Sequence, residues 1–470
     1  MKNFDFKKII NYKYAPLIIL ILAGLALNVY YFSANKAVWW DEAEYLSFAK
    51  HFGSDTTYSM SETRAINYPI MLYLFSKIFS GQELILRVLL IIISVCTIIA
   101  CYFLFKKLFN GIIAFLTTLM LLTNYLYLFF QIRFLTEIPS LMFMLIGLYF
   151  FMCEKNNKNN ILTGLFIGLS IATRFTSLLI IPCMIIYQLL KKEKMKNYYW
   201  ILFLILGFVP TIIFDLIRDF TPLREFFLMF SFNQNVAKNN PYYFIENFTG
   251  MFGELSVPFF IAGIIIMFAR IKNNKSDFLK KNLVFMFFLF HFLFYSFFSA
   301  WKEERYMLNL IPFYYCLVSI GILNLINLIL NNLNINYKKL IISIIVLSII
   351  IPNIQLGNSS IISKSESYKQ VKEVAEYAKN EFPFDSNIIT NSPPQVSYYA
   401  EKNILSLPSE LDNLYLVFEQ YNDTSLILIS AFEGIPSYFN EFNNAERFNI
   451  VKVGFIEKQS VAYLIQYNRD

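Results

Sequence analysis

Long apolar runs, separated by short lysine-rich segments, most restrict how this chain can fold. Hydrophobic residues make up 57% of its 470 residues, and Phe alone occurs 51 times, whereas soluble globular chains are typically about 45–50% apolar. A helix needs about 20 apolar residues to cross a bilayer. Runs near 84–105 and 111–130 have that length, and the run at 161–190 exceeds it. The pattern predicts an all-α polytopic membrane domain.

We expect about eleven transmembrane helices within residues 1–353. The run at 161–190 is divided at Arg174, where its apolar character is interrupted. Lysine-rich segments follow alternate spans, at 106–107, 155–158, 191–196, 270–281 and 338–339. Because short basic loops stay in the cytoplasm, these segments and the N-terminus are predicted to lie on the cytoplasmic side of the plasma membrane. The long loops at 34–83 and 218–254 then face outward.

The sequence changes character at about residue 363. Residues 368–380 have the pattern of an amphipathic helix, and 387–390, 414–418, 425–430 and 461–466 have that of short strands. We therefore expect a small soluble α/β domain over residues 363–470, on the extracytoplasmic side. It contains no recognisable catalytic motif.

Charge and cysteine usage exclude several classes of function. The net charge of +7 follows the loop lysines and so indicates topology, not nucleic-acid binding. The five cysteines lie in or beside apolar runs without metal-ligand spacing, and two histidines are too few for a His-rich metal site.

The stretch at 39–51 places three carboxylates within four residues of an otherwise charge-poor chain. Tyr45 and Phe48 recur at helical spacing, which predicts a short amphipathic helix at the membrane surface. Two interpretations remain open. Asp41 and Glu44 could be an N-cap and its capping-box partner. Alternatively, Asp41 and Glu42 form the acidic half of an active site just outside the bilayer.

Other charged residues converge on the same predicted outer face. Arg133 and Glu137 are four apart, a spacing that a simple surface ion pair also explains. Arg174 could reach the membrane interface or bind an anion, and the run 302–305 could be a solvated loop. Together these groups suit a substrate with a lipid tail and a phosphate head, since arginines bind phosphate and a carboxylate can deprotonate a hydroxyl.

The order of these motifs resembles the GT-C superfamily of integral-membrane glycosyltransferases. Within it, the chain looks most like the branch of protein O-mannosyltransferases and aminoarabinose transferases, which use polyprenyl-phosphate-linked sugars. The resemblance covers roughly residues 1–353. Its motifs are Trp40-Asp41-Glu42, Asn67-Tyr68-Pro69-Ile70, Glu83-Leu84-Ile85-Leu86-Arg87, Arg133-Phe134-Leu135-Thr136-Glu137, Ala172-Thr173-Arg174-Phe175-Thr176 and Arg305-Tyr306-Met307-Leu308-Asn309-Leu310-Ile311-Pro312.

The resemblance implies roles for individual residues. Asp41 would be the general base, Glu42 would position or tune it, and Glu137 would be the second acidic residue. Candidates for contacts to the substrate and its lipid phosphate are Arg64, Asn67, Tyr68, Arg133, Arg174, Lys302, Arg305 and Tyr306. Asn67 replaces a basic residue that the family often has at this turn, and Arg64 is a possible substitute.

The favoured function is transfer of a sugar, with inversion, from a polyprenyl-phosphate donor to a lipid, glycan or protein acceptor at the outer face. No metal is firmly expected. A first alternative is a metal-dependent oligosaccharide transferase, with Asp41 and Glu137 as ligands of Mg²⁺ or Mn²⁺. A second is a lipid or sugar transporter, but the charges gather at helix ends and there is no internal repeat.

Overall fold

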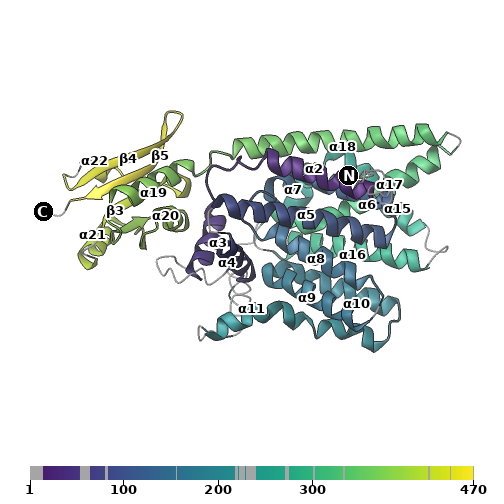
Figure 1. Cartoon of the computed structure of the whole chain (residues 1–470). Coiled ribbons are helices and arrows are strands. Elements are labelled where there is room, and N and C mark those ends of the chain that lie inside the picture. The colour runs from purple at the N-terminus through teal and green to yellow at the C-terminus, as the bar shows by residue number, and fades with distance from the viewer. Residues whose placement is uncertain are drawn as a thin grey trace, which may run out of the picture.

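The computed structural model describes residues 14–52, 64–79, 83–154, 156–217, 221, 228, 240–269, 275–299, 302–331, 334–421, 424–444 and 446–468. The N-terminal lysines and most of the predicted outer loop at 218–254 lie outside these residues. The described chain forms a bundle of helices with a mixed α/β domain beyond one end of it (Figure 1).

The bundle contains a helix for every predicted span. Its α-helices are α2 (Ala15–Tyr30), α5 (Glu83–Leu108), α6 (Gly111–Thr123), α7 (Tyr125–Phe130), α8 (Glu137–Phe151), α9 (Asn157–Thr173), α10 (Ile180–Leu190), α11 (Leu204–Ile217), α13 (Tyr243–Glu246), α14 (Phe248–Phe252), α15 (Val257–Ala269), α16 (Lys275–Phe297), α17 (Ile311–Ile329) and α18 (Ile335–Ser363). Short 3₁₀ helices are η1 (Phe175–Leu179), η2 (Met195–Ile201), η3 (Glu254–Ser256) and η4 (Glu304–Leu310).

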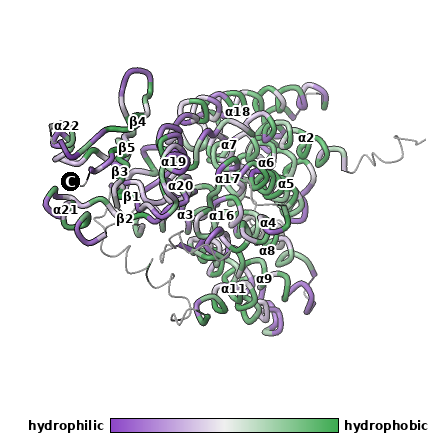
Figure 2. Tube along the Cα trace, turned by 60° about the vertical axis from the view of Figure 1, so that its left-hand side comes forward, coloured by the Kyte–Doolittle hydropathy of each residue, from purple (hydrophilic) through white to green (hydrophobic). Residues whose placement is uncertain are grey.

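Helix length supports a membrane-spanning body without fixing the number of crossings. Within the described residues, four helices are long and apolar enough to cross a membrane, at 83–108, 195–217, 304–329 and 335–363. Six further apolar helices are shorter, with 10–17 residues each. Figure 2 shows hydrophobic residues throughout the bundle and mainly hydrophilic ones over much of the C-terminal domain. The count of about eleven spans stays a prediction.

Two pairs of helices approach each other closely at glycines. A Cβ on Gly321 of α17 would lie 1.9 Å from the carbonyl oxygen of Phe259 in α15. A Cβ on Gly168 of α9 would lie 2.2 Å from the carbonyl oxygen of Leu204 in α11. Small residues let helices in a membrane pack backbone to backbone, so these glycines fix how α15 and α11 lie against the rest of the bundle.

Two short helices occupy the end of the bundle next to the C-terminal domain. They are α3 (Trp40–His51) and α4 (Asn67–Ile78), both from the predicted outer loop at 34–83. The helix expected after Trp39 is therefore confirmed, but its amphipathic character is not, because residues 45–49 are buried without a break. It is more enclosed than a helix lying on a membrane surface, because Tyr45, Leu46 and Phe48 are all buried.

The C-terminal domain is built on a five-stranded sheet in the order β2-β1-β3-β5-β4. The strands are β1 (Asn387–Thr390), β2 (Ile404–Ser406), β3 (Thr424–Ser430), β4 (Phe448–Ile456) and β5 (Gln459–Tyr467). β1 runs parallel to β2 and β3, whereas β5 is antiparallel to β3 and β4. Leu428 pairs with Leu464 in the β3–β5 register.

Helices cover both faces of this sheet. Ile388 and Leu426 pack in one core with α19 (Lys369–Glu381) and α20 (Pro393–Ala400), whereas Ile389 and Ile427 pack in another with α21 (Leu411–Gln420) and α22 (Glu441–Asn444). Neighbouring strand residues point to opposite faces, which explains why adjacent isoleucines serve different cores. The α/β character and the helix predicted at 368–380 are confirmed.

One predicted strand in this domain is wrong. Residues 414–418 lie in helix α21, where Leu414 and Phe418 are buried against the sheet. Residues four apart share a helix face, and a five-residue apolar stretch is too short to separate that period from the alternation of a strand. Strands β2 and β4 were not predicted.

Candidate active site

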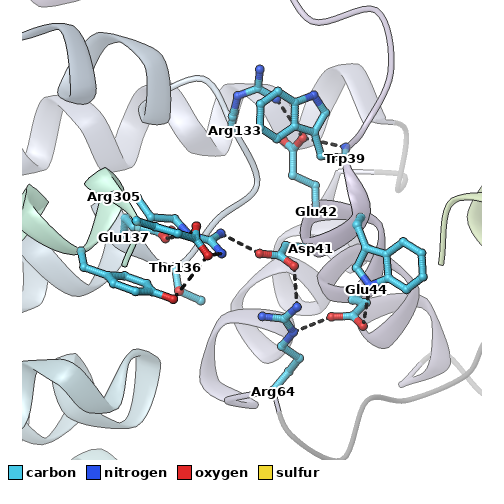
Figure 3. A network of polar contacts seen from close by, with 12 residues as sticks. Trp39, Asp41, Glu42, Glu44, Arg64, Arg133, Thr136, Glu137 and Arg305 are labelled. Atoms are coloured by element: carbon cyan, nitrogen blue, oxygen red, sulfur yellow. Dashed lines mark hydrogen bonds and ion pairs between the residues drawn. The ribbon is translucent and has the colours of Figure 1, made fainter. Parts of the chain in front are cut away.

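Helix α3 begins with a hydrogen bond that separates its first two carboxylates. The backbone N–H of Trp39 donates to Glu42 Oε2 at 2.9 Å. Trp39 is therefore the N-cap residue, and Glu42, at position N3, is its capping-box partner. The interpretation of Asp41 as an N-cap is wrong. Its side chain instead points away from Glu42 and toward the bundle (Figure 3).

Asp41 lies between two arginines from distant segments. Its Oδ1 accepts from Arg64 Nη2 at 2.5 Å, and its Oδ2 accepts from Arg305 Nη1 at 2.6 Å (Figure 3). Burial raises the pKa of the Asp41 carboxyl, but Arg64 and Arg305 lower it by more, so its pKa lies below the ordinary value. The side chain keeps 20% of its surface exposed, so an ionised carboxylate remains reachable from solvent.

Glu44 shares Arg64 with Asp41 but has no second arginine. Its Oε2 accepts from Arg64 Nε, and its Oε1 accepts from the indole N–H of Trp40 at 3.2 Å. Burial raises the pKa of Glu44 by more than Arg64 lowers it. The two carboxyls stand one helical turn apart on α3, and the presence of Arg305 beside only one of them gives their pKa values opposite directions.

Glu42 forms a buried ion pair with Arg133. The Arg133 Nη1–Glu42 Oε2 distance is 3.3 Å, and the backbone N–H of Phe134 donates to Glu42 Oε1 at 2.8 Å. The guanidinium carbon of Arg133 lies 3.5 Å from the ring centroid of Trp39 and 4.4 Å from that of Phe129. Burial lowers the pKa of Arg133 to about 10 despite this pairing. The pair holds α3 against the loop that precedes α8.

Glu137, the first residue of α8, is the second carboxylate of the site. Its Oε1 accepts from Arg174 Nη1 at 2.7 Å, and the same nitrogen lies 3.1 Å from Thr136 Oγ1. Arg305 Nε lies 3.7 Å from Glu137 Oε1 while its Nη1 contacts Asp41. One guanidinium therefore links the two carboxylates that the sequence motifs single out.

Aromatic rings surround this network. Tyr306 lies beneath both arginines, with its ring centroid 5.4 Å from the guanidinium carbon of Arg174 and 5.9 Å from that of Arg305. The Tyr68 ring packs edge-on against Tyr45 at 5.5 Å. The Tyr68 hydroxyl is buried and, within the described part of the chain, has no hydrogen-bond partner. The Tyr306 ring covers part of the two guanidinium groups, and the exclusion of water there strengthens their ion pairs.

Two predicted substrate-binding residues point elsewhere. The ammonium of Lys302 donates to the carbonyl oxygens of Tyr295, Ser296 and Ser299, and so closes the C-terminal end of α16. The Asn67 amide donates to the carbonyl of Gly207 at 3.1 Å and accepts from Thr211, so it joins α4 to α11. The structure brings neither side chain into the arginine–carboxylate network. Arg64, the suggested substitute for a basic residue at this turn, does enter it.

Three members of the network were not predicted as site residues. Glu44 was considered only as a capping partner, although its spacing of three from Asp41 places both on one helix face. Glu303 lies 2.5 Å from Arg305 Nε through its Oε2, and its place in the same charged run as Arg305 is the signal that could have identified it. Thr136 gave no such signal, because a single hydroxyl carries no pattern.

The donor groups do not suit the divalent cation considered as an alternative. Both Asp41 oxygens already accept charge-assisted hydrogen bonds from guanidinium groups, and Glu137 Oε1 accepts one from Arg174. Glu137 Oε2 has no hydrogen-bond partner among the described residues, but a cation shared with Asp41 would have to displace the guanidinium groups of Arg64 and Arg305. Within the described residues, no group of three or more His, Cys, Asp or Glu side chains could hold a metal ion.

Comparison with known proteins identifies the fold. Residues 63–214 match the family model described as dolichyl-phosphate-mannose-protein mannosyltransferase. No curated protein matches the chain in sequence. The solved structure of ArnT from Cupriavidus metallidurans bound to undecaprenyl phosphate is similar with a TM-score of 0.71 and 11% identity, covering 95% of this chain and 97% of that one.

Two further structures extend the comparison. AglB, an archaeal oligosaccharyltransferase from Archaeoglobus fulgidus, in complex with an inhibitory peptide and a dolichol-phosphate, gives a TM-score of 0.67 at 13% identity, over 94% of this chain and 72% of that one. The mycobacterial arabinofuranosyltransferase AftD gives 0.59 at 10% identity, over 97% of this chain and 40% of that one. The chain has the fold of the GT-C membrane glycosyltransferases, and the resemblance expected from its motifs is confirmed.

Proposed function

We propose that this protein is a membrane glycosyltransferase that moves a sugar from a polyprenyl-phosphate carrier to an acceptor hydroxyl at the outer face of the plasma membrane. The observation that carries the proposal is the position of Asp41. It is a partly exposed carboxylate between Arg64 and Arg305, and Arg305 also reaches toward Glu137. This arrangement supplies a base and cations side by side.

Asp41 is the proposed general base. It would accept the proton of the acceptor hydroxyl as the oxygen attacks the anomeric carbon, while the bond from that carbon to the lipid phosphate breaks. Attack opposite the leaving phosphate inverts the anomeric centre. Arg64 and Arg305 lower the pKa of Asp41 and so weaken it as a base. A donor phosphate that draws Arg305 away would raise that pKa and make Asp41 a stronger base when the donor is present.

Arg305 and Arg174 are the proposed ligands of the lipid phosphate. Glu137 holds Arg174 at 2.7 Å, and Tyr306 packs against both guanidinium groups. Prepositioned cations offset the charge that develops on a leaving phosphate without reorganising during the reaction. Glu42 and Arg133 would then act only by holding α3 in place.

Topology is the second part of the proposal. With a cytoplasmic N-terminus, the site and the C-terminal domain lie outside. A reporter that is active only in the cytoplasm, fused after Asp470, should be silent. An active fusion would reverse the predicted side of the C-terminal domain.

The direct test is incubation of the purified protein with a panel of polyprenyl-phosphate sugars and candidate lipid, glycan and peptide acceptors. Release of polyprenyl phosphate together with a glycosylated acceptor is expected for one donor, and Asp41→Asn should abolish both. Release that is equal in the wild type and in Asp41→Asn would overturn the assignment of the base.

A further inference from the structure

The C-terminal domain contacts the helix that carries Asp41. Helix α20 lies between the sheet and α3 (Figure 1). Residues 394–400, nearly all of α20, are buried. Burial on all sides is unusual for an eight-residue helix in a soluble domain, where one face normally meets water. The buried outer face of α20 therefore belongs to an interface with the membrane body.

Two contacts from this domain hold the segment that enters α3. The backbone N–H of Val38 donates to the hydroxyl of Tyr399 at 2.8 Å. The backbone N–H of Lys36 donates to the carbonyl of Ser365 at 3.1 Å. On the other side, Arg87 donates to the carbonyl of Asn35 at 3.3 Å. Residues 35–38 are thus fixed from both sides immediately before the helix begins.

The far end of α3 is held by the same short helix. Lys50, in the last turn of α3, pairs with Glu401 at 3.2 Å, and its ammonium lies 4.5 Å from the ring centroid of Tyr398. Glu401 follows α20 directly and is itself anchored by Lys379 of α19 at 2.6 Å. The segment that enters α3 and the last turn of α3 therefore both contact residues 398–401.

We propose that the C-terminal domain is a positioning element of the site, in which Tyr399 and Glu401 hold the two ends of α3 and so fix Asp41 between Arg64 and Arg305. The inference goes beyond the proposed function and, for its kinetic consequence, depends on it. Asp41 lies one turn from the Val38 contact, and its two arginines come from other segments of the chain, before α4 and within η4. A shift of α3 would therefore change the distances from Asp41 to both guanidinium groups at once.

The test uses Tyr399→Phe in the full-length protein. This change removes the acceptor for the Val38 N–H but keeps the buried ring. Tyr438→Phe is the matched control, because the Tyr438 hydroxyl also makes one hydrogen bond to the main chain, donating to the carbonyl of Pro408 at 2.6 Å, but on the side of the sheet covered by α21 and α22. Both variants lose one hydroxyl from the same domain, so a difference between them reports position in the fold.

The first measurement needs no substrate. Hydrogen exchange of the backbone amides at 38–51, followed by mass spectrometry, should become about 10-fold faster in Tyr399→Phe, as expected for loss of one buried hydrogen bond. It should be unchanged in Tyr438→Phe. Equal exchange in the wild type and Tyr399→Phe would overturn the proposal whether or not the protein transfers a sugar.

The second measurement is kinetic. Tyr399→Phe should lower kcat by about 10-fold, with the KM values for donor and acceptor nearly unchanged, because the groups that bind them stay in place. Lys50→Met and Glu401→Gln should each lower kcat, and the double variant should be no worse than the poorer single variant, as expected for one shared contact. Faster exchange with unchanged kcat would show that the domain holds α3 without positioning Asp41, and would overturn that part of the inference.

Discussion

Asp41 and Glu42 are neighbours in sequence, yet they belong to two different kinds of ion pair. The Glu42–Arg133 pair is almost fully enclosed, with exposed side-chain fractions of 2% and 0%. Asp41 and its two arginines keep 20–26% of their side-chain surface exposed. A buried pair cannot exchange partners without a large desolvation cost, whereas a partly exposed one can. The comparison assigns a structural role to Glu42 and leaves Asp41 available for the reaction, although both lie in the first turn of α3.

The largest expected effect is that of Asp41→Asn on turnover. The carboxamide keeps the shape of the side chain but cannot take a proton, so kcat should fall by about 10²–10⁴-fold. Thermal unfolding in detergent should change much less than turnover, because the side chain is partly exposed, does not cap the helix, and loses only its ion pairs with Arg64 and Arg305. Steady-state rates and melting curves on one preparation measure both quantities. A large loss of stability with near-normal turnover would show that the role of Asp41 is structural and not catalytic.

Glu42→Gln tests the other half of the comparison. It leaves the buried Arg133 guanidinium without a counter-charge, which should lower the free energy of unfolding by about 3–5 kcal/mol. Denaturant titration in detergent at neutral pH measures the loss. Adding Arg133→Met should recover part of it, because an apolar side chain can replace a buried ion at lower cost. If the single variant is fully stable but inactive, Glu42 takes part in the reaction directly.

Arginines 174 and 305 should show an intermediate effect confined to the donor. A charge-assisted hydrogen bond to phosphate contributes about 1.5–3 kcal/mol, so Arg174→Gln or Arg305→Gln should weaken the use of the donor by roughly 10- to 150-fold. Lysine should restore activity only in part, since it lacks the planar fork of arginine. Titrating the donor at fixed acceptor, and then the reverse, measures this. A defect seen only in the acceptor titration would move these arginines to the acceptor site.

Lys302→Gln is the matched control for the arginine variants. Lys302 is a cation in the same charged run as Arg305, but its ammonium donates to main-chain carbonyls at the end of α16 and lies 6.0 Å from the ring centroid of Phe244. Its loss should leave the titration of the donor unchanged.

The sequence predicted the bundle better than the details of the site. Long apolar runs predict membrane helices reliably, and each run expected to span the membrane is helical. Arg133 and Glu137, four apart, suggested one surface pair. The structure instead assigns Arg133 to Glu42 and Glu137 to Arg174. Glu137 opens α8 whereas Arg133 precedes it, so helical spacing does not apply between them. Partners 91 or 37 residues apart in sequence leave no local pattern.

The C-terminal domain shows the same limit. Its helix at 368–380 could be predicted from periodicity, and three strands from alternation. The contact between Tyr399 and Val38 spans 361 residues, and no spacing rule reaches that far. The prediction of a domain appended outside the body therefore missed its attachment to α3.

The smallest expected effect concerns the pH dependence of turnover, and it follows from the two arginines beside Asp41. The pKa of Asp41 is lowered, so the ionised form is favoured in the folded protein. The stabilisation that this provides is fully present above the unfolded pKa and is lost as pH falls through the lower, folded pKa. The acid limb of the kcat/KM profile should accordingly lie below the ordinary range of an aspartate. Arg64→Gln removes one of the two cations, so the pKa of Asp41 should rise and the limb should move to higher pH by about one unit.

Glu44→Gln should move the limb in the opposite direction, because it removes a nearby negative charge and frees Arg64 to interact with Asp41 alone. The kcat/KM profile is measured at limiting donor between about pH 2.5 and 8, a range that extends below the ordinary aspartate pKa of about 3.9. The pH of the acid limb should be lowest in Glu44→Gln, intermediate in the wild type and highest in Arg64→Gln. Coincident limbs in all three would mean that the titrating base is not in contact with Arg64. That outcome would direct the search to Glu137, which Arg64 does not touch among the described contacts.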